Sequence, residues 1–195
     1  MGNRKPGIGS RPRVGAAVRR LVRELGLVAE DEDCAALLAD ARALTRAELR
    51  EELGWTSSRL ERSIDRIRWR LRGDGDADLG KRLLLCAIGW RGSGAWAVRR
   101  EPIDLCLRGL DISRVQVRRM DLPTVERRFL AHVLHPDKGK RAFVARELSR
   151  KQGAVLKLAQ RVKARFGSFR RGQVALETLG RILEGERPRE THTAR

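Results

Sequence analysis

The chain has 195 residues, which is enough for one medium domain or two small ones and excludes a large multi-domain enzyme. Hydrophobic residues make up 41% of it but aromatic residues only 4%, and tyrosine is absent, so we expect an aliphatic core and a mainly helical fold. The 43 basic and 25 acidic residues give a net charge of +18, which favours a polyanionic partner, with nucleic acid as the leading candidate.

The basic residues are concentrated in particular segments rather than spread evenly. Residues 1–20 carry a net charge of +6 and residues 138–171 carry +11, whereas residues 21–54 carry −5. Separate basic segments of this kind predict separate polyanion-binding faces. No apolar run approaches the roughly 18 residues of a membrane span, and no apolar segment follows the basic N-terminus as in a signal peptide. We therefore expect a cytoplasmic, nucleoid-associated protein with no membrane contact.

The N-terminal part predicts a basic arm followed by four helices. Residues 1–13 contain glycine, proline and basic side chains without apolar periodicity, so we expect a disordered arm. Apolar spacing predicts helices at residues 14–27 and 34–43. Thr45 and Glu48 have the spacing of a capping box that opens a short helix through Leu53, and Gly54 is a suitable stop.

The fourth predicted helix, residues 59–71, has a core face and a basic face. Leu60, Ile64, Ile67 and Leu71 lie on one side at helical spacing, and four arginines follow the opposite side, namely Arg59, Arg62, Arg66 and Arg70. Together with the preceding short helix and the turn at Gly54, this is a helix-turn-helix layout, in which the second helix enters the major groove of DNA.

Two strand-like runs follow, at residues 82–90 (RLLLCAIGW) and 95–101 (AWAVRRE), joined by a glycine-containing turn. A helix-turn-helix followed by a hairpin resembles the winged-helix family of DNA-binding domains over residues 14–101. The resemblance implies a small α+β domain with a β-hairpin wing. It also implies that Arg91 lies at the tip of the wing and Arg99 and Arg100 on its return strand. The alternative is a generic small α+β unit whose arginines are simply solvated.

Residues 102–121 are expected to connect this domain to a second, helical module at residues 122–186. Leu122-Pro123 opens a predicted helix that ends near Pro136, and a short helix at 142–148 and a longer one at 152–166 follow. Residues 187–195 are expected to form a disordered tail.

The second module resembles region 4 of bacterial sigma factors and LuxR-like helix-turn-helix domains over residues 122–167. The matching parts are Leu122-Pro123 with Glu126-Arg127, the segment 144–148 (VAREL), and the segment 153–155 (GAV). The turn at residues 149–152 departs from the family pattern, and nothing upstream resembles sigma region 2, so a complete sigma factor is not expected. The resemblance implies that five side chains contact bases and phosphates: Lys151, Gln152, Lys157, Gln160 and Arg161.

Other motifs favour different functions less strongly. His135-Pro136-Asp137 resembles the loop of J-domain co-chaperones, but the residues expected around that loop are absent. His132 and His135 lack a carboxylate or thiol at metal-ligand spacing, and no phosphate-binding loop or catalytic motif occurs. We therefore expect no metal, no cofactor and no enzymatic activity. The three cysteines, Cys34, Cys86 and Cys106, are interpreted as buried thiols.

The sequence thus predicts a mainly α protein that consists of a winged helix followed by a helical helix-turn-helix module. Its predicted function is sequence-specific binding of double-stranded DNA, as a bacterial or phage transcriptional regulator that uses both modules. The alternatives are a plasmid or phage replication or packaging factor and, from another class, a J-domain-like co-chaperone. RNA polymerase or another protein as a further partner, and a homodimeric state, are left open.

Overall fold

The computed structural model describes residues 12–72, 76–92, 101–136, 141–167, 170 and 172–185, and the regular structure within these ranges is entirely α-helical. The helices are α1 (Pro12–Glu24), α2 (Glu30–Leu38), α3 (Arg46–Leu53), α4 (Ser57–Leu71), α5 (Asp76–Arg91), α6 (Pro102–Arg118), α7 (Thr124–Val133), α8 (Arg141–Glu147), α9 (Gln152–Phe166) and α10 (Gln173–Glu184). Residues 12 and 13 of the expected N-terminal arm belong to α1. The rest of that arm and the expected tail at 187–195 lie outside the described residues.

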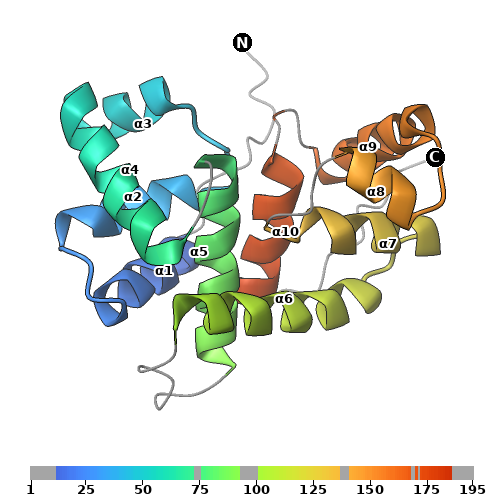
Figure 1. The fold of residues 1–195 in the computed structure, drawn as a ribbon, viewed down its shortest axis with the longest axis horizontal. Helices are drawn as coiled ribbons and strands as arrows, with labels where there is room; N and C mark the ends of the chain where they lie inside the picture. Colours follow the sequence, from blue (N-terminus) through green and yellow to red (C-terminus); the bar gives the residue numbers. More distant parts are fainter. Residues whose placement is uncertain are drawn as a thin grey trace, which may run out of the picture.

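Helices α5 and α10 lie between two groups of helices (Figure 1). Helices α1–α4 form one group, helices α7–α9 form the other, and α6 runs from α5 toward α7. Helix α5 packs against α1, α2, α4, α6 and α10, which makes it the centre of the hydrophobic core. None of the helices in the described ranges is long and apolar enough to cross a membrane.

The local signals predicted for α3 and α4 are confirmed, whereas the helix predicted at 34–43 is α2 at Glu30–Leu38. The backbone N–H of Glu48 donates to Thr45 Oγ1 at 3.3 Å, and Thr45 N–H donates to the Glu48 carboxylate at 2.8 Å, which completes the capping box. Gly54 ends α3 in the left-handed region with φ +63°. In α4, the predicted apolar stripe from Leu60 to Leu71 is buried.

The strand predicted at residues 82–90 is instead part of α5, so the winged helix expected over residues 14–101 is wrong. The described ranges contain no strand for a β-hairpin wing, and residues 93–100, with Arg99 and Arg100, lie outside them. Leu83, Leu84 and Leu85 are all buried because neighbours surround α5, so the apolar run has no periodicity that separates a strand from a helix. Of its nine residues only Ile88 is β-branched, and that composition favours the helix.

Helices α5 and α6 approach each other closely at two glycines. A Cβ atom added to Gly89 would overlap the carbonyl oxygen of Leu105, and one added to Gly109 would overlap the carbonyl oxygen of Leu85. The relation is reciprocal, because each glycine faces the carbonyl of the residue four positions before the other glycine. The two helix backbones are therefore so close at these positions that only glycine, which has no Cβ atom, fits there.

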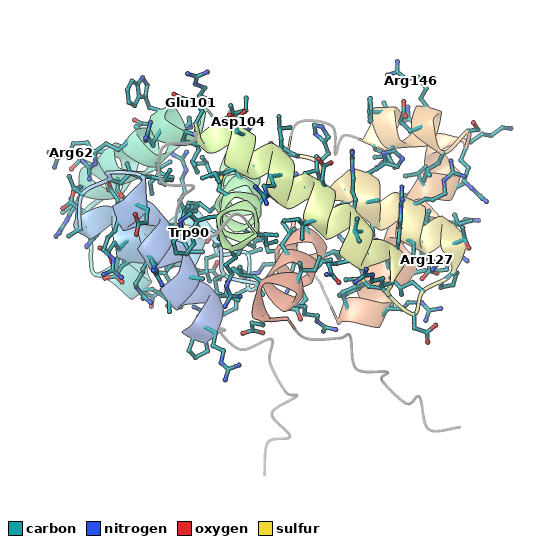
Figure 2. The ribbon with its side chains drawn as sticks, turned by 90° about the horizontal axis from the view of Figure 1, so that it is seen from below. Arg62, Trp90, Glu101, Asp104, Arg127 and Arg146 are labelled. Atoms are coloured by element: carbon teal, nitrogen blue, oxygen red, sulfur yellow. The ribbon has the colours of Figure 1, made fainter. Side chains whose placement is uncertain are left out.

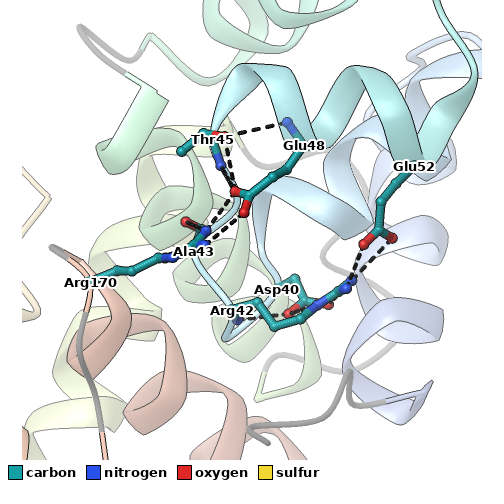
Figure 3. Close-up of polar contacts among 7 residues, drawn as sticks. All are labelled: Asp40, Arg42, Ala43, Thr45, Glu48, Glu52 and Arg170. Atoms are coloured by element: carbon teal, nitrogen blue, oxygen red, sulfur yellow. Dashed lines mark hydrogen bonds and ion pairs between the residues drawn. The ribbon is translucent and has the colours of Figure 1, made fainter.

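Helix α10 joins the C-terminal part of the chain to the N-terminal helices. All its residues from Gln173 to Gly180 are buried, against α5, α1, α6 and α9. Just before it, Arg170 donates to both carboxylate oxygens of Glu48 at 2.5 and 2.6 Å (Figure 3). This guanidinium is the main reason that the pKa of Glu48 is lowered to about 2, and the hydrogen bonds from Thr45 add to the effect.

Candidate nucleic-acid interface

Helices α7, α8 and α9 form a small three-helix unit with its own apolar contacts. Its buried side chains include Phe129, Leu130, Val144, Leu148, Val155, Leu158 and Val162. The turn between α8 and α9 depends on Ser149, which takes a left-handed conformation with φ +51° where glycine is usual. The N–H of Arg150 then donates to the carbonyl of Ala145 at 2.9 Å. The unusual residues of this turn thus form a helix C-cap, and α9 begins directly after it.

The five side chains predicted to contact DNA on this module are all exposed: Lys151, Gln152, Lys157, Gln160 and Arg161. Their helix buries Val155, Leu158, Val162 and Phe166 on the opposite side. Within the described part of the chain, no carboxylate pairs with Lys151, Lys157 or Arg161. Residues 141–167 contain eight basic residues and one acidic residue, Glu147, so this face is positive and its cations are available to an external anion.

One cation of α9 is used inside the unit. Arg165 Nε lies 2.8 Å from Glu126 Oε2, and the Glu126 side chain is only 4% exposed. This ion pair connects α9 to α7. It sets the orientation of α9 on its supporting helix, because Glu126 is buried in the contact between the two helices.

The arginines of α4 have a different environment. Arg66 donates to both carboxylate oxygens of Asp31, at 2.7 and 3.0 Å, and to Glu30 at 2.5 Å. Arg59 pairs with Glu30 at 3.2 Å and stacks over Trp55. Both acids come from the acidic first turn of α2. Two of the four arginines on the predicted basic face of α4 are therefore paired with carboxylates of a neighbouring helix.

These contacts have a clear electrostatic effect. The hydrogen bond from Arg66 is the largest cause of the lowered pKa of Glu30. Conversely, the Asp31 carboxylate is the largest cause of the raised pKa of Arg66. Asp31 has no solvent exposure and also accepts a hydrogen bond from Ser63 Oγ at 2.6 Å. The cluster is thus a structural ion pair between α2 and α4.

The other residues of the N-terminal half that were predicted to contact DNA each have a different environment. Arg70 donates to the carbonyl of Leu25 at 2.9 Å, so its guanidinium also joins two helices. Arg62 is exposed, and its Nε donates to the carbonyl of Ser58 at 3.2 Å. Arg91 ends α5 and donates to the carbonyl of Leu183 in α10, so the position expected for it at the tip of a wing is wrong. Figure 2 shows Arg62 and Arg146 at opposite ends of the molecule, so the outer face of α4 is far from the α7–α9 unit.

A basic cleft between α6 and α7 was not predicted from the sequence. It has a volume of about 580 Å³ and is lined by Arg114, Arg118, Thr124, Arg127, Arg128, Ala131 and His132. The sequence does not indicate the positive charge of this cleft, because the net charge of residues 102–137 is only +1. Among the described residues, no acidic side chain lines the cleft.

His132 lines this cleft, and His135 of the J-domain-like motif lies three residues after it in the sequence. Burial lowers the pKa of His132, Arg114 and Arg128 act in the same direction, and Glu147 opposes them. The carbonyl of His135 accepts a hydrogen bond from Lys81 Nζ at 3.3 Å. Asp137, the third residue of the motif, lies outside the described residues.

Cys34, Cys86 and Cys106 are buried thiols, as predicted. Burial and a hydrogen bond with Cys106 raise the pKa of Cys86, the hydrogen bond being the larger cause, so its protonated form is favoured.

The resemblance of residues 122–167 to sigma-factor region 4 depends on the motif residues alone, since it has no support from relatives. No protein-family model, curated protein or solved structure matches this chain.

Proposed function

We propose that this chain binds double-stranded DNA through the α7–α9 unit, with α9 lying in the major groove. The observation that carries the proposal is the exposed face of α9, whose Lys151, Lys157 and Arg161 have no carboxylate partner in the described residues. A helix of this kind, supported by two shorter helices, is the recognition element of helix-turn-helix proteins. The unpaired cations supply phosphate contacts, which contribute much of the affinity for DNA.

The same face contains groups suited to reading bases. The amides of Gln152 and Gln160 offer both donors and acceptors, which match the N6 and N7 atoms of adenine in the major groove. Lys157 and Arg161 suit guanine O6 and N7 or the phosphates on either side. A face that combines amides with cations therefore supports sequence-specific binding, and such binding serves a transcriptional regulator.

The proposal uses one recognition helix and not two. The guanidinium groups of Arg59 and Arg66 meet the carboxylates of α2, and breaking these pairs to bind phosphate would leave Asp31 buried without its main partner. Binding of phosphate by Lys157 and Arg161 of α9 breaks no ion pair within the described residues. We therefore assign the groove contacts to α9 and a structural role to Arg59 and Arg66 of α4.

The test begins with selection of bound duplexes from a random-sequence pool, followed by affinity measurements on the recovered sequence. The variant Lys157→Ala/Arg161→Ala should weaken binding by about 1–3 kcal/mol for each residue that reads a base. The variant Arg23→Ala/Arg50→Ala is the matched control, because it removes two exposed cations from α1 and α3. It should bind nearly as well as the unmodified protein.

Two results would contradict the proposal. An equal loss of affinity in both double variants would mean that net charge alone drives binding. A selection that recovers no preferred sequence would leave a general polyanion-binding protein and remove the regulatory role. Circular dichroism of each variant checks that the helices are intact.

A further inference from the structure

The cleft between α6 and α7 contains a concentration of guanidinium groups that the proposed DNA contact does not use. Arg114 and Arg118 lie one helical turn apart on α6, and Arg127 and Arg128 lie on α7. Within the described ranges, no ion pair joins any of the four to a carboxylate. Four unpaired guanidinium groups around one concave space repel one another, and a ligand of high negative charge relieves that repulsion.

Part of the cleft is already arranged for binding. Arg127 Nη1 donates to the carbonyl of Arg118 at 2.9 Å, and its Nη2 donates to Thr124 Oγ1 at 3.2 Å. These two contacts hold the guanidinium between the helices, so less conformational entropy is lost when a ligand binds. Arg114 and His132 are half-buried, which reduces solvent screening of charges placed between them.

The cleft is separated from the DNA-binding face of α9. Helix α7 lies between α6 and α9 (Figure 1). Thr124, Arg128 and Ala131 share one side of α7 at intervals of three and four residues, whereas Glu126 points to α9 from the other side. A duplex that follows the exposed face of α9 therefore does not enter this cleft.

We propose that the α6–α7 cleft binds a small polyphosphate-bearing molecule, such as a nucleoside triphosphate. Guanidinium groups recognise phosphate through paired N–H donors, and several of them together suit adjacent phosphates rather than a single one. The volume of about 580 Å³ lies in the range of small-ligand sites and exceeds the space that one phosphate needs. The planar faces of arginine and histidine also stack on a nucleobase.

The site is tested by isothermal titration calorimetry of the full chain with ATP and with inorganic triphosphate, at about 0.15 M salt, where diffuse surface attraction is screened. Both probes should bind at one site per chain. Tighter binding of ATP shows that the nucleoside contributes, and equal binding shows that the phosphates alone are recognised; both results support the site. Absence of binding by both probes overturns the proposal.

Variants assign the site to the cleft. Arg114→Ala/Arg128→Ala should weaken binding of the probe by at least about tenfold, because charge-assisted hydrogen bonds are lost. Arg114→Lys/Arg128→Lys, which keeps the charge but not the paired donors, should recover only part of the affinity. Lys157→Ala/Arg161→Ala on α9 is the control and should leave ATP binding unchanged. An equal loss in the control overturns the proposal.

The DNA measurement separates this site from the proposed function. Arg114→Ala/Arg128→Ala should retain its affinity for duplex DNA, whichever way the ATP experiment turns out. If instead it loses duplex binding as strongly as the α9 variant while ATP does not bind, the cleft belongs to the DNA interface and the small-ligand site is rejected. Thermal unfolding of the two cleft variants shows whether a loss comes from the site or from the fold.

Discussion

Arg66 on α4 holds both carboxylate oxygens of Asp31 on α2, at 2.7 and 3.0 Å, and that carboxylate has no exposure to solvent. A side chain that the sequence places on the outer stripe of a recognition helix is therefore part of a contact between two helices. Removing one member of such a pair leaves a buried charge without its partner.

Replacing Arg66 by alanine should lower the free energy of unfolding by about 2 kcal/mol. This is below the about 3–5 kcal/mol expected for a fully buried pair, because the Arg66 side chain is 37% exposed and water reaches it. Replacing Arg62 by alanine, on the exposed side of the same helix, should change stability by no more than about 0.5 kcal/mol. Urea unfolding of the two variants measures the difference, and equal midpoints would show that the Asp31 contact is not stabilising.

Stability should depend on pH through Glu48. Its pKa falls from an ordinary value of 4.5 to about 2 in the folded chain, mainly because of Arg170, so the folded state prefers the charged carboxylate. The stabilisation is fully present above pH 4.5 and is lost as the pH falls toward 2. The lowered pKa of Glu30, caused chiefly by Arg66, acts in the same direction.

The variant Glu48→Gln isolates this contribution, because glutamine also serves in a capping box but does not titrate. Its melting temperature should fall less between pH 4.5 and 2 than that of the unmodified chain. Parallel melting curves over this interval would mean that the contact between Arg170 and Glu48 does not persist in solution.

Gly89→Ala and Gly109→Ala should each lower the free energy of unfolding by at least about 2 kcal/mol, because the added methyl group overlaps a backbone carbonyl of the facing helix. Gly153→Ala in α9 is the control, since no atom lies within 4 Å of the added Cβ. It should stabilise the chain by about 0.5–1 kcal/mol through helix propensity. Chemical denaturation orders the three variants, and an unaffected Gly109→Ala would show that α5 and α6 are farther apart.

The salt dependence of DNA binding should report the phosphate contacts of α9. Affinity for duplex DNA should fall steeply with salt, because each neutralised phosphate releases counterions. If Lys157 and Arg161 both contact phosphate, their removal should reduce the magnitude of the slope of log K against log salt by about 2. The Arg23→Ala/Arg50→Ala variant should keep the original slope, and a flat response of the unmodified chain would exclude DNA as the main partner.

Features that depend on neighbours in the sequence could be predicted without the structure. The capping box of Thr45 and Glu48 and the stop at Gly54 were readable because caps are made within a few residues. The buried stripe of α4 and the exposed face of α9 followed from helical periodicity, because a single side of each helix faces the core. Which side chains of α9 are exposed can therefore be predicted from the sequence of that helix alone.

Tertiary packing decided the features that the sequence left ambiguous. Residues 82–90 form part of helix α5, and their sequence shows no helical periodicity because α5 packs against five other helices. Only the fold shows that Asp31 lies against Arg66 and that Glu48 lies against Arg170, 122 residues away. Arg59 and Arg66 of α4 look like the arginines of the α6–α7 cleft in the sequence, but the first two face carboxylates, and within the described ranges the cleft arginines do not. Whether a cation is available for a ligand depends on charges brought near it by the fold, since electrostatic interactions act through space and not along the chain.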